Sequence, residues 1–395
     1  MVTTGRSKPP TIDLGDVGLD EGGHLLLARA LAERAPGETI AVAGTHTHLS
    51  LHLSTWARTT GHEYRELDGQ SIIVRGHVID DRWRTAVRAP DPMTRPEPSW
   101  GFAARGARIE AGGPAAIADI LEPADAWVDL APRLYAQAIA AQWDPATAVP
   151  WHEPRTHSDD TERALTQVMT YLVENELAAL VAPSRYIARI HPHFREVLQL
   201  LAIQCADEAR HVEVFTRRAT LHGGTLGTST VGGRTSLHTL VTEPDYHLAT
   251  FLLSVLGEGS FLSLLAFVEQ HAPDDTTRTI AHLALQDEAR HVAFGQAHLE
   301  HAVGGDPRLR DRLRAVVERR HAALADTAGL NADVFDALVV VAAGDWEPHA
   351  LRAGWRAVQQ LQDDMDAGRR RRLARLGFSD ADARALSQLH TRNFM

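Results

Sequence analysis

Apolar positions in the larger, C-terminal part of the chain recur at helical spacing from about residue 121 onward. Clusters of glycine and proline interrupt this pattern and mark turns between elements. The uninterrupted stretches therefore predict a mainly α-helical domain over residues 121–395. Its expected helices lie near 158–190, 194–221, 245–271, 276–303, 308–326, 332–343, 345–374 and 379–391.

The first 85 residues follow a different pattern. Two short runs, 39–43 and 71–74, are rich in β-branched residues and are typical of strands. Two stretches with helical spacing, 25–34 and 49–58, are each followed by a turn signal. Residues 1–85 are therefore expected to form a small α+β domain with βαβαββ-like order.

Proline and glycine dominate the segment between these two parts. Four prolines lie between residues 90 and 98, and four glycines follow between 101 and 113. Such a composition favours irregular backbone. The sequence thus predicts a linker over 86–120.

One six-residue motif occurs twice in the helical part. Residues 207–212 and 287–292 both read Asp-Glu-Ala-Arg-His-Val. A Glu and a His three positions apart project from the same side of a helix. This is the Glu-x-x-His pair found in dimetal helical bundles, in which two other helices each supply one more Glu.

The expected extra carboxylates are found upstream of each motif. Glu258 stands in an otherwise uncharged stretch, where an unpartnered carboxylate would be costly to bury. Before the first motif there are two candidates, Glu174 and Glu176. We choose Glu176 because its helical stripe is apolar throughout, whereas the stripe through Glu174 is mixed.

The predicted metal site therefore has four carboxylates and two imidazoles. Two divalent ions would nearly balance the four negative charges. Oxygen donors with two imidazoles favour iron or manganese over zinc or copper(I). The predicted ligands are Glu176, Glu208, His211, Glu258, Glu288 and His291.

Several neighbours of these ligands are candidates for supporting roles. Asp207 and Asp287 precede the ligand Glu residues and could each accept a hydrogen bond from the His across the bundle. Cys205, Gly257 and Phe215 are candidate pocket residues, although a buried Cys is commonly only a small hydrophobe. No catalytic residue beyond the ligands is predicted.

Composition narrows the choice of partners. The net charge of −11 disfavours nucleic acid and anionic membranes. No run of about 18 uncharged apolar residues suggests a membrane span, and the N-terminus does not resemble a signal peptide. A single cysteine excludes an internal disulfide and favours a cytoplasmic location.

The paired motifs, together with Glu176 and Glu258, resemble the ferritin-like di-iron carboxylate superfamily over residues 150–303. The resemblance implies a ferritin-like four-helix bundle with additional C-terminal helices. It also implies two iron ions, as Fe/Fe or Mn/Fe, and dioxygen as co-substrate. An electron donor such as a ferredoxin or a flavin reductase, and a homodimer, would fit the same resemblance.

Departures from individual members of this superfamily narrow the function. Reductase small subunits carry a radical Tyr four residues after the first ligand His, where this chain has Phe215. Monooxygenases carry a Thr at the position of Leu262, and arylamine N-oxygenases carry a third His at the position of Ala284. These departures leave dioxygen activation without a named substrate.

Residues 18–76 resemble the small TusA-like sulfur-carrier proteins. Those proteins depend on a Cys-Pro motif at the start of their first helix, whereas this chain has His24 there and no Cys in the domain. Sulfur transfer is therefore not expected, and docking or dimerisation is the simpler interpretation. His46, His48 and His52 lack nearby acids or Cys and are not expected to bind a metal.

The expected function is a non-haem di-iron oxygenase or oxidase that acts on a small organic substrate. Hydroxylation, N-oxygenation, desaturation and C–C cleavage all stay open as reaction outcomes. The alternative is a ferroxidase or peroxide-scavenging di-iron protein without an organic substrate. A manganese catalase or a scaffold with a vestigial site is a third possibility.

Overall fold

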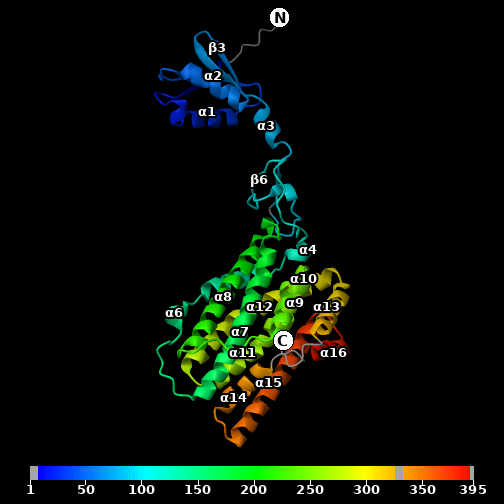
Figure 1. Ribbon diagram of the computed structural model, residues 1–395. Helices are drawn as coiled ribbons and strands as arrows, with labels where there is room; N and C mark the ends of the chain where they lie inside the picture. The colour runs from blue at the N-terminus through cyan, green and yellow to red at the C-terminus, as the bar shows by residue number, and fades with distance from the viewer. Residues whose placement is uncertain (1–7, 90, 325–331, 392–395) are drawn as a thin grey trace. The chain divides into compact units, whose positions relative to one another are not determined.

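A computed structural model of the chain describes residues 8–89, 91–324 and 332–391 (Figure 1). The chain divides into two compact units. The smaller consists of Met1–Pro90 with Ala103–Pro114, and the larger of Asp91–Phe102 with Ala115–Met395. The predicted linker, 86–120, is thus shared between the two units.

The smaller unit contains a four-stranded sheet with strand order β1-β2-β4-β3. β1 and β2 are parallel, and the other neighbouring strands are antiparallel. Leu27, Leu53 and Ile73 are fully buried between the sheet and its helices. The predicted βαβαββ order is confirmed. Its elements are β1 (Thr11–Asp13), α1 (Gly23–Ala32), β2 (Thr39–Ala43), α2 (Leu49–Thr60), β3 (Glu63–Leu67) and β4 (Gln70–Val74).

The rest of this unit is a short extension beyond the sheet. An ion pair of 2.8 Å between Arg82 Nε and Glu110 Oε1 joins its two ends. The resemblance to sulfur carriers stays a prediction. The elements of the extension are α3 (Val78–Trp83), β5 (Val87–Arg88) and β6 (Arg108–Ile109).

Four long helical segments form the bundle at the centre of the larger unit. α7 packs along α8, α11 packs along α12, and α8 contacts α12 (Figure 1). Side-chain caps start two of them, since Ser158 accepts from the Thr161 amide and Asp274 from the Thr277 amide. The bundle segments are α7 (Asp159–Ile187), α8 (Arg195–Thr220), the continuous run α10 (Tyr246–Thr250), η4 (Phe251–Glu258) and α11 (Gly259–His271), and α12 (Asp275–Gly305).

The third segment is not a regular α-helix. Its middle part, η4, is π-helical and ends at Glu258. π-helical turns are uncommon and frequently lie at functional sites. Gly295 of α12 permits close packing here, because a Cβ atom at this position would overlap the side chain of Ser254.

Further helices surround the bundle. α14 packs on α7 and α15, α15 packs on α11, and α9 lies against α7 and α13. The predicted fold class is therefore confirmed: a mainly α protein with a four-helix bundle and added C-terminal helices, preceded by a small α+β unit. The surrounding elements are α4 (Pro123–Ala126), α5 (Ala131–Ala140), α6 (Pro145–Ala148), α9 (Val231–Val241), α13 (Leu309–Leu324), α14 (Ala332–Ala343), α15 (Pro348–Arg375) and α16 (Asp380–Thr391).

One described stretch, Tyr246–His271, is long and apolar enough to span a membrane. Of its most apolar window, 78% is buried inside the protein. That burial is typical of a core helix in a bundle. The stretch contains η4, and its apolar side chains contribute to the core on both sides of Glu258.

Candidate metal centre

The structure brings all six predicted ligands together in the middle of the bundle. α7 supplies Glu176, and η4 supplies Glu258. α8 and α12 supply the two Glu-x-x-His pairs. Each of the six residues is at most 5% exposed. Glu174, the rejected candidate, is only partly buried and lies outside the cluster.

The ligand atoms form two overlapping groups. One group is Glu176, Glu208, His211 and Glu288, and the other is Glu208, Glu258, Glu288 and His291. Within each group all the ligand atoms lie within 4.8 Å of one another. Glu208 and Glu288 belong to both groups, so each can offer one oxygen to each of two adjacent ions. The cluster can therefore hold a carboxylate-bridged dinuclear centre.

Each His presents one ring nitrogen to the carboxylates. Nδ1 of His211 lies 3.5 Å from Glu176 Oε2 and 3.3 Å from Glu288 Oε1. Nδ1 of His291 lies 3.0 Å from Glu208 Oε1 and 3.6 Å from Glu288 Oε2. Both imidazoles thus direct Nδ1 into the space between the acids, where a metal ion would lie.

The hydrogen-bonding capacity of the cluster is not satisfied by the protein. Buried carboxylate oxygens of Glu176, Glu208, Glu258 and Glu288 have no hydrogen-bond partner among the described residues. Unpaired buried polar atoms are costly and rare in folded proteins. Two bound cations would compensate the four buried carboxylates, whereas the protein alone leaves some of their oxygens without a partner.

The electrostatics of the metal-free cluster agree with this interpretation. Burial, and then the charge of Glu208, raise the pKa of Glu176 well above its ordinary value. The pKa of Glu258 is also raised well above its ordinary value, mainly by burial and then by the negative charge of Glu288. Burial opposes protonation of His211, but Asp287 and the surrounding acids outweigh it, so its pKa is raised. In the absence of metal the cluster retains protons, which bound cations would displace.

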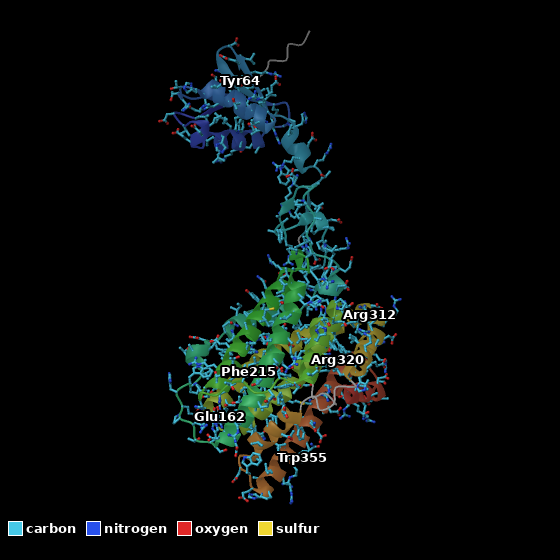
Figure 2. The ribbon with its side chains drawn as sticks, in the orientation of Figure 1. Tyr64, Glu162, Phe215, Arg312, Arg320 and Trp355 are labelled. Atoms are coloured by element: carbon cyan, nitrogen blue, oxygen red, sulfur yellow. The ribbon has the colours of Figure 1, made fainter. Side chains whose placement is uncertain are left out.

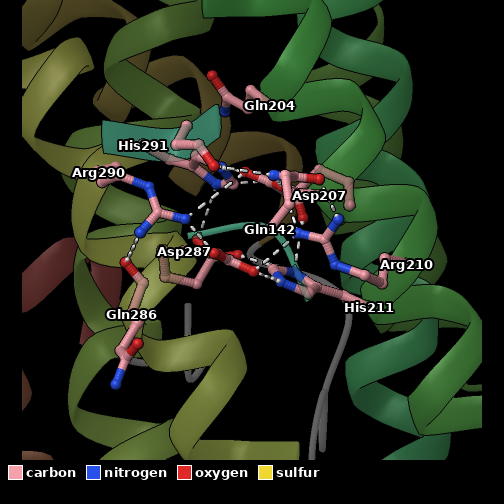
Figure 3. A network of polar contacts seen from close by, with 12 residues as sticks. Gln142, Gln204, Asp207, Arg210, His211, Gln286, Asp287, Arg290 and His291 are labelled. Carbon is pink, nitrogen blue, oxygen red and sulfur yellow. Dashed lines mark hydrogen bonds and ion pairs between the residues drawn. The ribbon is translucent and has the colours of Figure 1, made fainter. Parts of the chain in front are cut away.

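Asp287 and Asp207 orient the two imidazoles across the bundle (Figure 3). Nε2 of His211 on α8 lies 3.2 Å from Asp287 Oδ2 on α12. Nε2 of His291 on α12 lies 3.3 Å from Asp207 Oδ2 on α8. An Nε2–H that donates to Asp leaves Nδ1 as the metal-binding nitrogen. The two predicted partners therefore lie where the repeat places them.

Arginines close this network on its outer side. Arg210 Nη2 bonds Asp207 and also lies 3.1 Å from Asp287 Oδ2. Arg290 forms an ion pair with Asp287 (Figure 3). Neither arginine belongs to the metal-binding groups. They neutralise the aspartates that orient the imidazoles.

Three further residues of the network were not predicted from sequence. Trp143 donates its indole N–H to Asp287 Oδ2 at 2.9 Å and stacks on His211. Gln142 donates to Asp207 Oδ1 at 3.1 Å. Gln204 donates to Glu258 Oε1 at 3.1 Å. Only Gln204 carried a local signal, because it lies four residues before Glu208 on the face of α8 that carries this ligand.

A small internal cavity of about 20 Å³ adjoins the cluster. Its wall includes three of the carboxylates and a set of apolar side chains. Gly257, a predicted pocket residue, lies on this wall. Cys205 instead contacts the carbonyl of Leu180, and Phe215 packs in the apolar core beside His211. The apolar part of the wall is formed by Ala179, Leu237, Leu240, Leu252, Leu253 and Phe261.

The histidines of the small unit form a loose surface group. The rings of His46, His48 and His52 have centroids 5.3–6.4 Å apart. In the described part of the chain they do not form a metal-binding group.

Similarity to known proteins is limited to solved structures, since no family profile and no curated protein matches the sequence. An R2-like ligand-binding oxidase with an aerobically reconstituted metal cofactor after photoconversion is 17% identical, with 67% of this chain and 94% of that chain covered and a TM-score of 0.43. A structure of an R2-like ligand-binding oxidase with an aerobically reconstituted Mn/Fe cofactor is 16% identical and has a TM-score of 0.44. The match covers 65% of this chain and 93% of that chain. A mutant of an R2-like ligand-binding oxidase with an aerobically reconstituted Fe/Fe cofactor is 18% identical and has a TM-score of 0.43. The match covers 60% of this chain and 93% of that chain. At this level of similarity, the assignment of this chain depends on its own residues.

Proposed function

We propose that the protein is a non-haem dinuclear oxidase or oxygenase, with an Fe/Fe or Mn/Fe centre, that uses dioxygen to oxidise a small organic molecule. The observation that carries this proposal is the buried set of four carboxylates and two imidazoles, two of whose carboxylates are shared between adjacent groups. Oxygen-rich sets with two imidazoles favour iron or manganese. Two divalent ions would balance the charge of four carboxylates.

The chain has distinct tasks around this centre. Glu208 and Glu288 would bridge the ions, while Glu176 and Glu258 would each bind one of them. When bound, the ions supply the redox chemistry for the reduction of dioxygen. The apolar wall of the cavity excludes bulk water, and the two aspartates keep the imidazoles in the metal-binding tautomer.

A hydrogen-bonded chain connects this buried site with the surface. The partly exposed indole of Trp143 donates to Asp287, which accepts from His211. We infer that an external reductant, such as a ferredoxin or a flavin reductase, delivers electrons at Trp143. Arg210 lies over the indole ring, with Cζ 4.7 Å from the centroid, and holds the ring in place beside the two aspartates.

The alternative, a ferroxidase or peroxide scavenger without an organic substrate, is favoured by the size of the cavity. Its volume of about 20 Å³ is close to the space needed for a single water molecule. Organic ligands generally occupy pockets of about 300–1,000 Å³. An organic substrate would therefore require the cavity wall to move, whereas dioxygen alone would not.

Dioxygen uptake distinguishes the two functions. The full chain is loaded with Fe(II) without oxygen, mixed with dioxygen, and then supplied with ascorbate and an organic candidate. An oxygenase should continue to consume dioxygen after the iron is oxidised and should yield an oxidised organic product by mass spectrometry. Uptake that stops when the iron is oxidised, with no organic product, would support the ferroxidase and contradict our proposal.

A further inference from the structure

A buried arginine lies on the wall of the cavity that adjoins the metal centre. Arg320 of α13 is labelled in Figure 2 and is 7% exposed. It shares the cavity wall with Glu176, Glu258 and Glu288. Its Nη2 donates to the hydroxyl of Ser236 at 2.6 Å. In the described ranges no carboxylate forms an ion pair with it. Arg320 therefore holds a positive charge in the core with only a neutral partner.

Another buried arginine shows how this chain compensates such a charge elsewhere. Arg218 of α8 bonds both oxygens of Glu162 at 2.9 and 3.0 Å and Asp274 Oδ2 at 2.7 Å. Burial alone would lower the pKa of Arg218, but these acids raise it. For Arg320, burial dominates and lowers the pKa to about 10. A buried cation without a paired anion is destabilising, and a bound anion would relieve that cost.

Arg320 also lines a surface groove. The groove has a volume of about 220 Å³ and runs between α9 and α13, past Thr239, Glu243 and Arg319. Arg320 and Leu252 line both the groove and the cavity. A molecule that enters through the groove would meet the guanidinium before it reaches the metal ligands.

A second buried polar group lies behind the cavity wall. The hydroxyl of Tyr171 has no hydrogen-bond partner among the described residues, and its ring stacks on Phe261 of that wall. The residues that line the cavity include no second cation. The site thus fits a singly charged anion better than a phosphate, which carries more charge at neutral pH.

We propose that Arg320 binds the carboxylate of a small monocarboxylic substrate, whose apolar remainder extends along the leucine-lined wall toward the metal centre. This inference rests on the proposed function, since it names the substrate class of that site. An incoming carboxylate would form a bidentate pair with the guanidinium. The same contact would draw the side chain away from the junction and join the groove to the cavity, which provides the room that the cavity alone lacks.

The test is binding of hexanoate, hexan-1-ol and hexylamine to the full chain by calorimetry, both metal-free and loaded with Fe(II) without oxygen. Wild type should bind hexanoate at least tenfold more tightly than hexan-1-ol, and hexylamine should not bind. Arg320→Met should weaken hexanoate binding at least tenfold, and Arg320→Lys should weaken it less. Arg312→Met removes an exposed arginine of the same helix that lines neither the groove nor the cavity, and it should leave binding unchanged.

The same experiment contains the outcomes that would overturn the proposal. One is equal affinity of wild type for hexanoate and hexan-1-ol, or no binding of hexanoate at all. Another is hexanoate binding only to the iron-loaded protein and equally in Arg320→Met, because the metals themselves would then hold the carboxylate. Failure of wild type to load iron would contradict the proposed function, whereas hexanoate binding to the metal-free chain still tests Arg320 separately.

Discussion

The two halves of the metal centre carry the same motif but are completed by different surroundings. The first half consists of α7 and α8 with Glu176, and the second of η4 and α12 with Glu258. Four residues before its ligand Glu, α8 has Gln204, which donates to Glu258. At the matching position α12 has Ala284, which packs in the apolar core. The repeat therefore fixes the ligands, while the residues between them make the halves unequal.

The two halves differ more in their charges at the position ten residues after Glu208 and after Glu288. At that position α8 has Arg218, which is paired with two acids, and α12 has His298, whose Nε2 lies 2.9 Å from His247 Nδ1. Burial, and then the charge of His247, lower the pKa of His298 well below its ordinary value. One end of the bundle is thus closed by a cluster of paired charges, and the other by the buried His298, which contacts a second histidine. The two copies of the motif are thus followed by buried residues that differ in charge.

The largest expected effect comes from the charged end. Arg218→Met leaves Glu162 and Asp274 buried with His157 as their one remaining ion-pair partner among the described residues, so the free energy of unfolding should fall by about 3–5 kcal/mol. His298→Met removes one hydrogen bond between two histidine rings and should cost about 1 kcal/mol. Chemical denaturation of the two metal-free variants measures both values. Equal losses would show that the two ends do not differ as described.

A smaller difference is expected between the aspartates that orient the imidazoles. Asp287→Asn and Asp207→Asn should each weaken metal binding about 10–100-fold, because each removes the charge that orients a ligand His. The effect of Asp287→Asn should be the larger, since only Asp287 also accepts from Trp143. Competition titrations with a coloured chelator measure both affinities. Unchanged affinity in both variants would contradict this role.

The smallest effect is a pH dependence at the end of the bundle that contains His298. The folded chain resists protonation of His298, whereas the unfolded chain binds that proton near pH 6.5, so stability is lost as the pH falls below 6.5. Between pH 6.5 and 5.5 wild type should lose up to about 1.4 kcal/mol more than His298→Met. Denaturant midpoints of the two proteins at several pH values measure this difference. Parallel curves would contradict a neutral buried His298.

Much of the fold could be predicted from hydrophobic periodicity. All eight helices predicted after residue 158 have helical counterparts, and most bounds agree within about three residues. α9 was missed because its two glycines fall in a stretch that the sequence marks as a break, and packing against α7 and α13 stabilises it. The π-helical form of η4 could not be predicted, because its side chains are apolar on every face.

Some residues of the candidate site could be predicted from their neighbours in the sequence, and others could not. The six ligands and the two aspartates were accessible because helical spacing relates each residue to its neighbours within the motif. Trp143 and Arg320 reach the site from elements far along the chain, and no local pattern connects them with it. Their roles depend on tertiary packing, which periodicity does not describe.

If the six buried residues hold two metal ions, removal of one ligand should lower the number of ions bound per chain. The full chain is loaded with Fe(II) without oxygen, desalted, and assayed for iron by mass spectrometry, with helicity checked by circular dichroism. Wild type and the matched control Glu174→Ala should each retain two ions per chain, whereas Glu176→Ala and Glu258→Ala should each lose at least one without loss of helicity. Retention of two ions by both ligand variants, or fewer than two in wild type, would contradict the account.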